Sequence, residues 1–187
     1  MTVTLRPATT GDLMLVGALH QRSRVAAYSS FLPAAALAEP TGAAMGSYWV
    51  ERWTWEHDDH RMTVAERDGR LVGFSYLGPD DEGDPGTGLL NAIHLDPAER
   101  GRGTGRQLMV DALEAMRSRG WSRAVLWVLR DNARARAFYE RGGWAATGQI
   151  RDERIGPVAV PQLRYGRPLC GSPDVTARRD GPAGPAG

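Results

Sequence analysis

The feature that most constrains this chain is a glycine-rich turn between an apolar strand and an amphipathic helix. The strand spans residues 89–95, and the helix is expected over residues 103–119. The turn between them reads Arg100-Gly101-Arg102-Gly103-Thr104-Gly105-Arg106. The first turn of a helix has unpaired backbone N–H groups and the positive end of the helix dipole. Glycines let an anion approach these groups, so the turn is expected to bind pyrophosphate; a solvated glycine-rich connection is the alternative.

Two common phosphate-binding motifs do not match this turn. The phosphate loop of nucleotide hydrolases requires a lysine, whereas all 23 basic residues of this chain are arginines. The dinucleotide fingerprint requires G-x-G-x-x-G and an acidic residue about 20 positions later. Here the spacing is G-x-G-x-G, and the later positions hold Val125 and Leu126. The absence of lysine also excludes Schiff-base chemistry by this chain.

The hydrophobic pattern predicts one mixed α/β domain over residues 1–169. Strands are expected at 3–6, 62–65, 71–76, 89–95, 124–129, 144–150 and 161–165. Helices are expected up to residue 27 after Thr10-Gly11-Asp12, and over residues 45–56, 103–119 and 134–141. Residues 28–44 are interpreted as a loop or a broken helix. The order of elements indicates a central sheet of about seven strands flanked by four helices.

Composition narrows the class of protein further. A net charge of +1 argues against a dedicated nucleic-acid binder, and one cysteine, Cys170, excludes an intramolecular disulfide framework. His57 and His60 lack a third matched ligand, so no metal site is expected. The first residues do not resemble a signal peptide and no apolar run approaches a membrane span, so we expect a soluble cytoplasmic protein. Seven of residues 170–187 are Gly or Pro, which predicts a disordered tail.

Two motifs at the expected separation resemble the GCN5-related N-acetyltransferase family. The family's acetyl-CoA motif, R/Q-x-x-G-x-G/A, is matched by Arg100 to Gly105, and Ile93-His94-Leu95-x-Pro97 is similar to its fourth strand. Residues 126–144 are similar to its fifth strand, its N-x-x-A-x-x-F-Y helix and its glycine stop. The resemblance covers residues 1–169 and implies a mixed, mostly antiparallel sheet and acetyl-CoA as co-substrate.

The resemblance also implies roles for individual residues. Backbone groups of His94 and Leu95 would hold the pantetheine arm, and the amides from Gly101 to Arg106 would hold the pyrophosphate. Tyr139 would be the general acid, because a phenol can protonate the departing thiolate. The residues assigned to the cofactor are His94, Leu95, Arg100, Gly101, Arg102, Gly103, Thr104, Gly105, Arg106, Asn132 and Ala135. Asn132 as a helix cap and Tyr139 as a core aromatic are the simpler alternatives.

The general base is not identified by the sequence. Relatives carry a glutamate at the positions that Leu89 and Trp127 occupy here. Strict alternation along residues 89–95 places Asn91 on the face of Leu89 and His94 on the opposite face. His94, a chain of water molecules, or an acid such as Asp84 or Glu153 stay open as the proton acceptor.

The expected activity is acetyl transfer from acetyl-CoA to a primary amine of a small molecule. The resemblance implies that the acceptor enters between the loop with Tyr28, Phe31 and Leu32 and residues 151–154. Acidic loops at 56–59 and 80–84 would favour a cationic amine if they face that cleft, or are solvated surface. Acetylation of a protein N-terminus or lysine, and a CoA-binding module without catalysis, are the alternatives. No nucleic-acid or membrane partner is expected, and a homodimer is left open.

Overall fold

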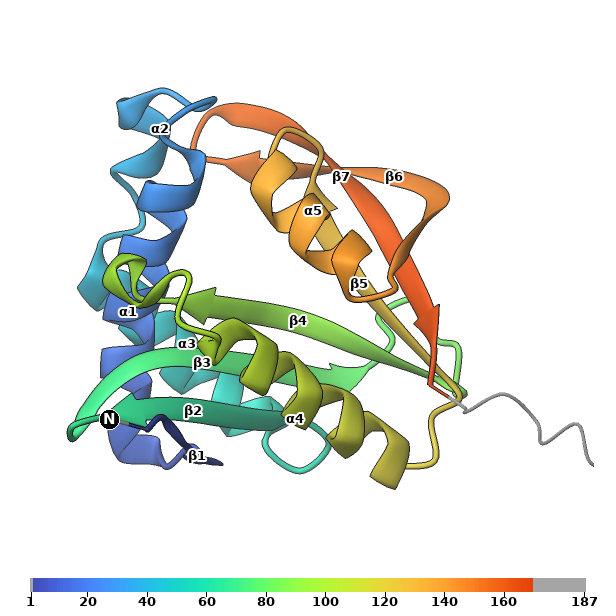
Figure 1. Ribbon diagram of the computed structural model, residues 1–187. Coiled ribbons are helices and arrows are strands. Elements are labelled where there is room, and N and C mark those ends of the chain that lie inside the picture. Colours follow the sequence, from blue (N-terminus) through green and yellow to red (C-terminus); the bar gives the residue numbers. More distant parts are fainter. Residues whose placement is uncertain (1, 170–187) are drawn as a thin grey trace, which may run out of the picture.

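A central sheet with helices on both faces forms the protein, and the computed structural model describes residues 2–169 (Figure 1). Residues 170–187, where a tail is predicted, lie outside the described part. The strands are β1 (Thr4–Pro7), β2 (Arg61–Arg67), β3 (Arg70–Pro79), β4 (Thr87–Leu95), β5 (Arg123–Leu129), β6 (Ala145–Ile155) and β7 (Val158–Pro168). The helices are α1 (Leu13–Tyr28), α2 (Ala34–Leu37), α3 (Gly42–Glu56), α4 (Thr104–Ser118) and α5 (Ala133–Arg141), with short 3-10 turns η1 (Thr10–Asp12) and η2 (Pro97–Glu99).

The sheet confirms the expected seven strands, in the order β1-β2-β3-β4-β5-β7-β6. Every neighbouring pair is antiparallel except β4 and β5, which run parallel. Helices α1 and α3 cover one face, and α4 and α5 cover the other (Figure 1). The described residues contain five α-helices rather than the expected four, because one short helix, α2, forms within the segment interpreted as a loop or broken helix.

Aromatic side chains attach α3 to the sheet. Trp49 is 1% exposed and packs edge-to-face against Phe74 and Tyr76, with ring centroids 5.4 and 5.0 Å away. Burying a large apolar side chain stabilises a fold by about 1.5–3 kcal/mol, and edge-to-face aromatic pairs add to this. Trp49 therefore belongs to the core, whereas Tyr48 and Trp55 of the same helix are 44% and 82% exposed.

Strands β4 and β5 pair over only part of their lengths. Their register runs from Thr87 opposite Arg123 to Leu90 opposite Leu126. Beyond these residues, β4 continues its pairing with β3 as far as Leu95, and β5 continues with β7 as far as Leu129. The two strands therefore diverge in the middle of the sheet, and one backbone edge of residues 91–95 has no strand partner in the described structure.

A β-bulge in β4 changes which side chains share a face. Leu90 pairs with Leu77 and Ala92 pairs with Tyr76, so Asn91 is an additional residue in β4. Asn91 contacts α3 through Arg52, and His94 contacts α1 through Ser23. Both side chains therefore lie on the face covered by α1 and α3. The expectation that His94 points away from Asn91 was wrong, because strict alternation ends at the bulge.

The β6–β7 hairpin reaches across to α2. It is longer than expected, since residues 151–155 also form strand. Ile155 and Val160 pack against Leu32 and Leu37. At the tip, Gly156 has a φ of +58°, and a Cβ there would come within 3.2 Å of the backbone of Ala36. This contact joins the β6–β7 hairpin to α2.

Candidate active site

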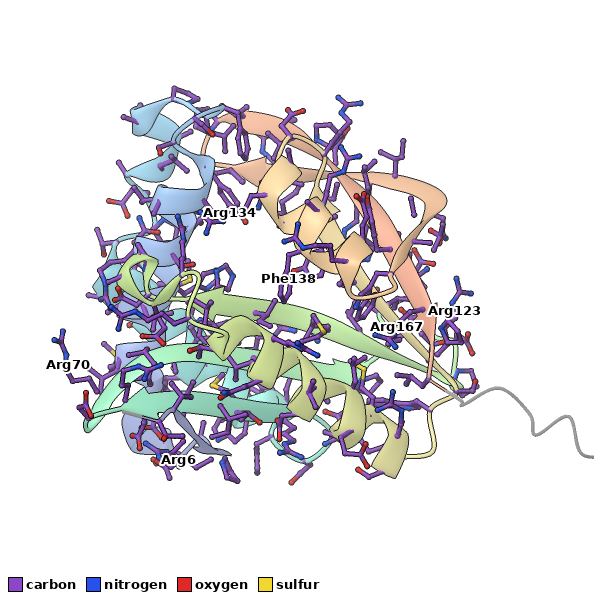
Figure 2. The ribbon with its side chains drawn as sticks, viewed as in Figure 1. Arg6, Arg70, Arg123, Arg134, Phe138 and Arg167 are labelled. Atoms are coloured by element: carbon purple, nitrogen blue, oxygen red, sulfur yellow. The ribbon has the colours of Figure 1, made fainter. Side chains whose placement is uncertain are left out.

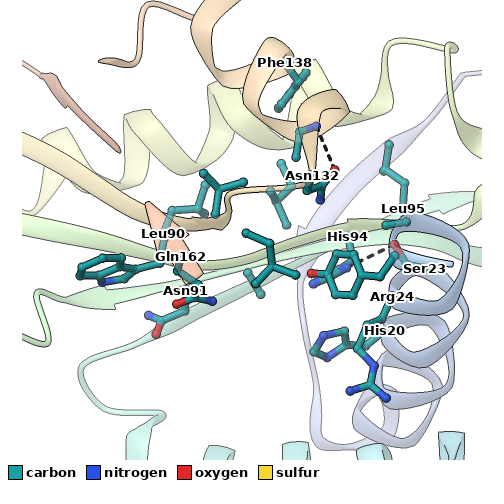
Figure 3. Close-up of a pocket in the computed structure, with 18 of the residues that line it drawn as sticks. His20, Ser23, Arg24, Leu90, Asn91, His94, Leu95, Asn132, Phe138 and Gln162 are labelled. Carbon is teal, nitrogen blue, oxygen red and sulfur yellow. Dashed lines mark hydrogen bonds between the residues drawn. The ribbon is translucent and has the colours of Figure 1, made fainter. Parts of the chain in front are cut away.

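A cavity of about 990 Å³ occupies the place where β4 and β5 diverge. Its walls come from α1, α3, the start of α4, α5 and β6 (Figure 3). Phe138 projects from α5 into the space above β4 (Figure 2). Most of the predicted site residues line this cavity, namely His94, Leu95, Arg100, Gly101, Gly103, Gly105, Arg106, Asn132, Ala135 and Tyr139. Leu89 and Trp127, which replace the glutamates of relatives, also line it.

The start of α4 forms a cradle of free backbone amides at residues 101–105. Gly101 and Gly103 have φ values of +80° and +86°, which L-residues rarely adopt, and a Cβ at either position would meet no atom within 4 Å. Among the described residues, the amides of residues 101–105 have no hydrogen-bond acceptor. The Arg106 amide differs, since it donates to Gly103 O at 3.0 Å. Five neighbouring free amides at a helix N-terminus suit a pyrophosphate group.

Glu99 stabilises the conformation of the cradle through contacts with Thr104 and Arg67. Its carboxylate is 4% exposed, accepts a hydrogen bond from Thr104 Oγ1 at 2.6 Å and pairs with Arg67 at 2.6 Å. Arg102 lies 4.0 Å from the same carboxylate. Consequently the side chains of Thr104 and Arg102 do not line the cavity. Thr104 can contribute to the cradle through its free amide rather than its hydroxyl.

Positive charge surrounds the cradle. Arg100, Arg106 and Arg134 all line the cavity. Burial lowers the pKa of Arg100, and the charge of Arg134, which lines the same cavity, lowers it further. Such a pair is stabilised by an anion between them. The electrostatics at this end of the cavity therefore match the phosphates of a coenzyme A molecule.

Asn132 both caps α5 and faces the cavity. Its Oδ1 accepts a hydrogen bond from Ala135 N at 3.2 Å, so the helix-cap interpretation is confirmed (Figure 3). Its Nδ2 donates to no acceptor among the described residues. The cap fixes the orientation of the amide and leaves these hydrogen atoms available to a ligand.

The phenol side chains of Tyr28 and Tyr139 both line the cavity, and neither hydroxyl has a hydrogen-bond partner in the described structure. Tyr139 is 9% exposed and packs edge-to-face against Phe138 and Trp144. Burial, followed by the proximity of Tyr28, raises the Tyr139 pKa above its usual range. Burial also raises the pKa of Tyr28 to about 12. Both phenols are therefore protonated at neutral pH and able to donate a proton.

His94 is a poor proton acceptor in this environment. Its Nδ1 lies 3.2 Å from Ser23 Oγ, and its ring centroid is 4.1 Å from that of His20 (Figure 3). Burial, followed by the charge of Arg24, lowers the His94 pKa to about 4. Burial also lowers the pKa of His20, whose Nδ1 accepts a hydrogen bond from Trp49 Nε1 at 3.2 Å. A base this weak cannot readily take a proton from an alkylammonium ion.

Arginines neutralise most of the acidic groups near the cavity. Glu56 pairs with Arg52 at 2.6 Å, and Asp81 pairs with Arg151 at 2.8 Å. Asp80 and Glu82 both pair with Arg164. Of the residues in the two acidic loops, only Asp81 lines the cavity, and its charge is paired with Arg151.

Asp84 and Glu153, the two carboxylates considered as general bases, differ in their position relative to the cavity. Asp84 accepts hydrogen bonds from Thr87 Oγ1 and Gly86 N, and it does not line the large cavity. Glu153 lines the cavity, and its carboxylate accepts a hydrogen bond only from the amide of Arg154 among the described residues. Of these two acids, the structure places only Glu153 at the site.

A polar stripe on α1 completes the cavity wall. His20, Arg24 and Tyr28 recur every four residues, so they lie on one face of the helix. Sequence reasoning assigned no role to His20 or Arg24, although this spacing was the available signal. Arg52 of α3 also lines the wall, where Nη2 donates to Asn91 Oδ1 at 2.9 Å.

Residues 2–169 contain no group of three or more His, Cys, Asp or Glu side chains arranged to hold a metal ion. Within the same residues, no helix combines the length and apolar character needed to cross a membrane.

The family is established by comparison with known proteins. The model of the acetyltransferase (GNAT) family matches residues 28–144, and the chain belongs to this family. The mycothiol acetyltransferase of Beutenbergia cavernae is 39% identical over 101 residues, which are 54% of this chain and 29% of that protein. An uncharacterized N-acetyltransferase of Methanocaldococcus jannaschii is 31% identical over 101 residues, 51% of this chain and 44% of that protein. The chain thus spans less than half the length of these relatives.

Solved structures confirm the fold. The PaiA N-acetyltransferase of Thermoplasma acidophilum, solved in complex with coenzyme A, has a TM-score of 0.71 at 17% identity and covers 90% of this chain and 99% of that one. A putative phosphinothricin N-acetyltransferase has a TM-score of 0.72 at 23% identity, covering 91% of this chain and 100% of that one. The expected sheet architecture and family resemblance are both confirmed.

Proposed function

We propose that this acetyltransferase moves an acetyl group from acetyl-CoA to a primary amine of a small molecule. The observation that carries the proposal is the shared cavity. One end has the free amides of residues 101–105 and the cations Arg100, Arg106 and Arg134, and the same cavity holds the buried phenol of Tyr139. An anion cradle and a proton donor in one cavity fit transfer from a phosphorylated thioester.

Residues of the chain fit the donor at three places. The amides of the cradle bind the pyrophosphate, and the free edge of β4 at residues 91–95 binds the pantetheine amides as an added strand would. The Nδ2 of Asn132 supplies a further hydrogen bond. When bound, acetyl-CoA supplies an acetyl group activated as a thioester.

The reaction then requires three proton movements. The acceptor ammonium first loses one proton to solvent, and the neutral nitrogen forms a bond to the acetyl carbon while the carbon–sulfur bond breaks. Tyr139 donates its phenolic proton to the departing sulfur. The second proton on the nitrogen restores the phenol, so an ammonium acceptor yields an amide, a thiol and one released proton.

A small molecule is favoured over a protein as the acceptor. The β6–β7 tip packs on α2, where a Cβ at Gly156 would come within 3.2 Å of the backbone of Ala36, so these two elements leave no gap for a polypeptide at this contact. The relatives named mycothiol acetyltransferases are consistent with a small acceptor. Acetylation of a protein is therefore the less favoured activity.

Two measurements on the full chain test this proposal. Calorimetry should detect binding of acetyl-CoA, and a thiol-release screen should detect turnover with members of a panel of small primary amines. Release with peptides alone would indicate a protein acetyltransferase. Binding of acetyl-CoA without release for any amine or peptide would refute catalysis and indicate a CoA-binding module.

A further inference from the structure

Two charged side chains at the acceptor end of the cavity lack a partner of opposite charge. Arg24, from α1, and Glu153, from β6, both line the cavity. Neither forms an ion pair within 4.0 Å among the described residues, unlike Arg52 with Glu56 and Arg151 with Asp81. Charges held away from water are normally paired, so the buried Arg24 points to a ligand that supplies the missing negative charge. Glu153 is half-buried and offers a negative charge in the same cavity.

Arg24 is the stronger of the two observations because it is 8% exposed. Its Nε donates to Gln21 Oε1 at 3.1 Å, and its Nη2 donates to the carbonyl oxygens of Leu37 and Glu39 at 3.4 and 2.5 Å. These acceptors are all uncharged. Its Nη1 donates to no acceptor among the described residues. The guanidinium is therefore held in a fixed position with one donor group still free.

Glu153 provides a negative charge in the same part of the site. Within residues 2–169, its carboxylate accepts a hydrogen bond only from the backbone amide of Arg154, which leaves most of its acceptor capacity free. Arg24 donates to the carbonyl oxygen of Leu37, and Leu37 packs in one cluster with Tyr28 and with Ile155, which lies two residues after Glu153 in β6. A cationic and an anionic group therefore line the cavity on either side of the same apolar cluster.

We propose that the acceptor is an amino acid or a similar amine with a carboxylate, whose ammonium group binds Glu153 and whose carboxylate binds Arg24. This inference rests on the proposed acetyl transfer and narrows its substrate class. A guanidinium with a free donor binds a carboxylate through a charge-assisted hydrogen bond, and a glutamate binds an ammonium group in the same way. An amine without an anionic group leaves the positive charge of Arg24 without a partner of opposite charge.

The test compares matched acceptors in a thiol-release assay with the full chain. Each amino acid of a panel is paired with its decarboxylated amine and its carboxamide. The wild-type protein should prefer the carboxylate form by at least about tenfold in kcat/KM, as expected for one charge-assisted contact. Equal rates for the amino acid and its decarboxylated amine would overturn the proposal without any variant being needed.

Variants of Arg24 test whether its side chain binds the carboxylate of the acceptor. Arg24→Gln should abolish the preference by lowering kcat/KM for the amino acid, with the decarboxylated amine unchanged within about twofold. Arg24→Lys keeps the charge and should retain part of the preference, and the acetyl-CoA Kd and a thermal melt report whether each variant is folded. Arg154→Gln is the matched control, since it removes an exposed arginine from the wall of the same cavity and should keep the preference.

Glu153→Gln should lower kcat/KM for the acids and for the amines alike. A loss of preference in Arg154→Gln equal to that in Arg24→Gln would refute a specific contact and indicate a general positive field. Acetyl-CoA binding without release for any acceptor would refute the proposed function itself. Release without a carboxylate preference would refute only this inference.

Discussion

Replacing Gly103 with aspartate should separate the stability of α4 from its ability to bind acetyl-CoA. Gly103 is the residue before the first turn of α4, has a φ of +86° and faces open space. A non-glycine residue in this conformation costs about 1–2 kcal/mol. Aspartate recovers part of this cost, because its carboxylate interacts favourably with a helix N-terminus. We therefore expect a folded variant with a small loss of stability.

The effect on acetyl-CoA should be larger than the effect on folding. The new carboxylate would lie beside the free amides of residues 101–105, where the pyrophosphate is proposed to bind. Two like charges about 5 Å apart repel by about 3 kcal/mol at an effective dielectric constant of about 20. Salt screens part of this repulsion, so a loss of at least about tenfold in affinity, ~1.4 kcal/mol, is expected.

Calorimetric titration with acetyl-CoA measures the effect, and Gly103→Ala is the control. Alanine has the same backbone cost without the charge, so it should lose stability and retain more affinity than aspartate. The cradle assignment would be refuted if Gly103→Asp were folded and bound acetyl-CoA with wild-type affinity.

Three further predictions concern chemistry, recognition and pH. Tyr139→Phe should lower kcat by roughly 10²–10⁴-fold with little change in the acetyl-CoA Kd. Tyr28→Phe should not lower kcat to this extent. Near-normal turnover of Tyr139→Phe would indicate that Tyr139 is a core aromatic residue without a catalytic role. Asn132→Asp keeps the helix cap and removes the amide hydrogens, so thermal stability should hold while acetyl-CoA affinity falls; unchanged affinity would leave only the cap role. The His94 pKa of about 4 lies below its ordinary value of 6.5, so the unfolded chain binds the proton more readily. Stability should therefore decrease as the pH falls from 6.5 to about 4, by the order of 3 kcal/mol, in urea titrations, and His94→Gln should flatten this dependence.

The parts of the site that depend on local spacing were predictable from the sequence. The cradle follows from alternating glycines between a strand and a helix, and the cap of α5 follows from Asn132 three residues before Ala135. In both cases the backbone groups involved lie within one turn of the residues that determine them. The hydrophobic pattern likewise located all seven strands, because each carries apolar residues that must be buried.

The parts that depend on pairing between distant segments were not predictable. The bulge at Asn91 depends on the register between β3 and β4, and it moves His94 to the face opposite the one that alternation predicts. Charged residues 151–154 hid the second half of β6, which is a strand because it pairs with β7 at the edge of the sheet. Whether Arg24 and Glu153 form ion pairs also depends on which loops fold against them.

A crystal structure with bound acetyl-CoA tests the central claim most directly. The pantetheine arm should lie between β4 and β5 along residues 91–95, the pyrophosphate should accept hydrogen bonds from the amides of residues 101–105, and the thioester should lie beside the hydroxyl of Tyr139. Acetyl-CoA bound outside this cavity, or bound with these amides still free, would contradict the account.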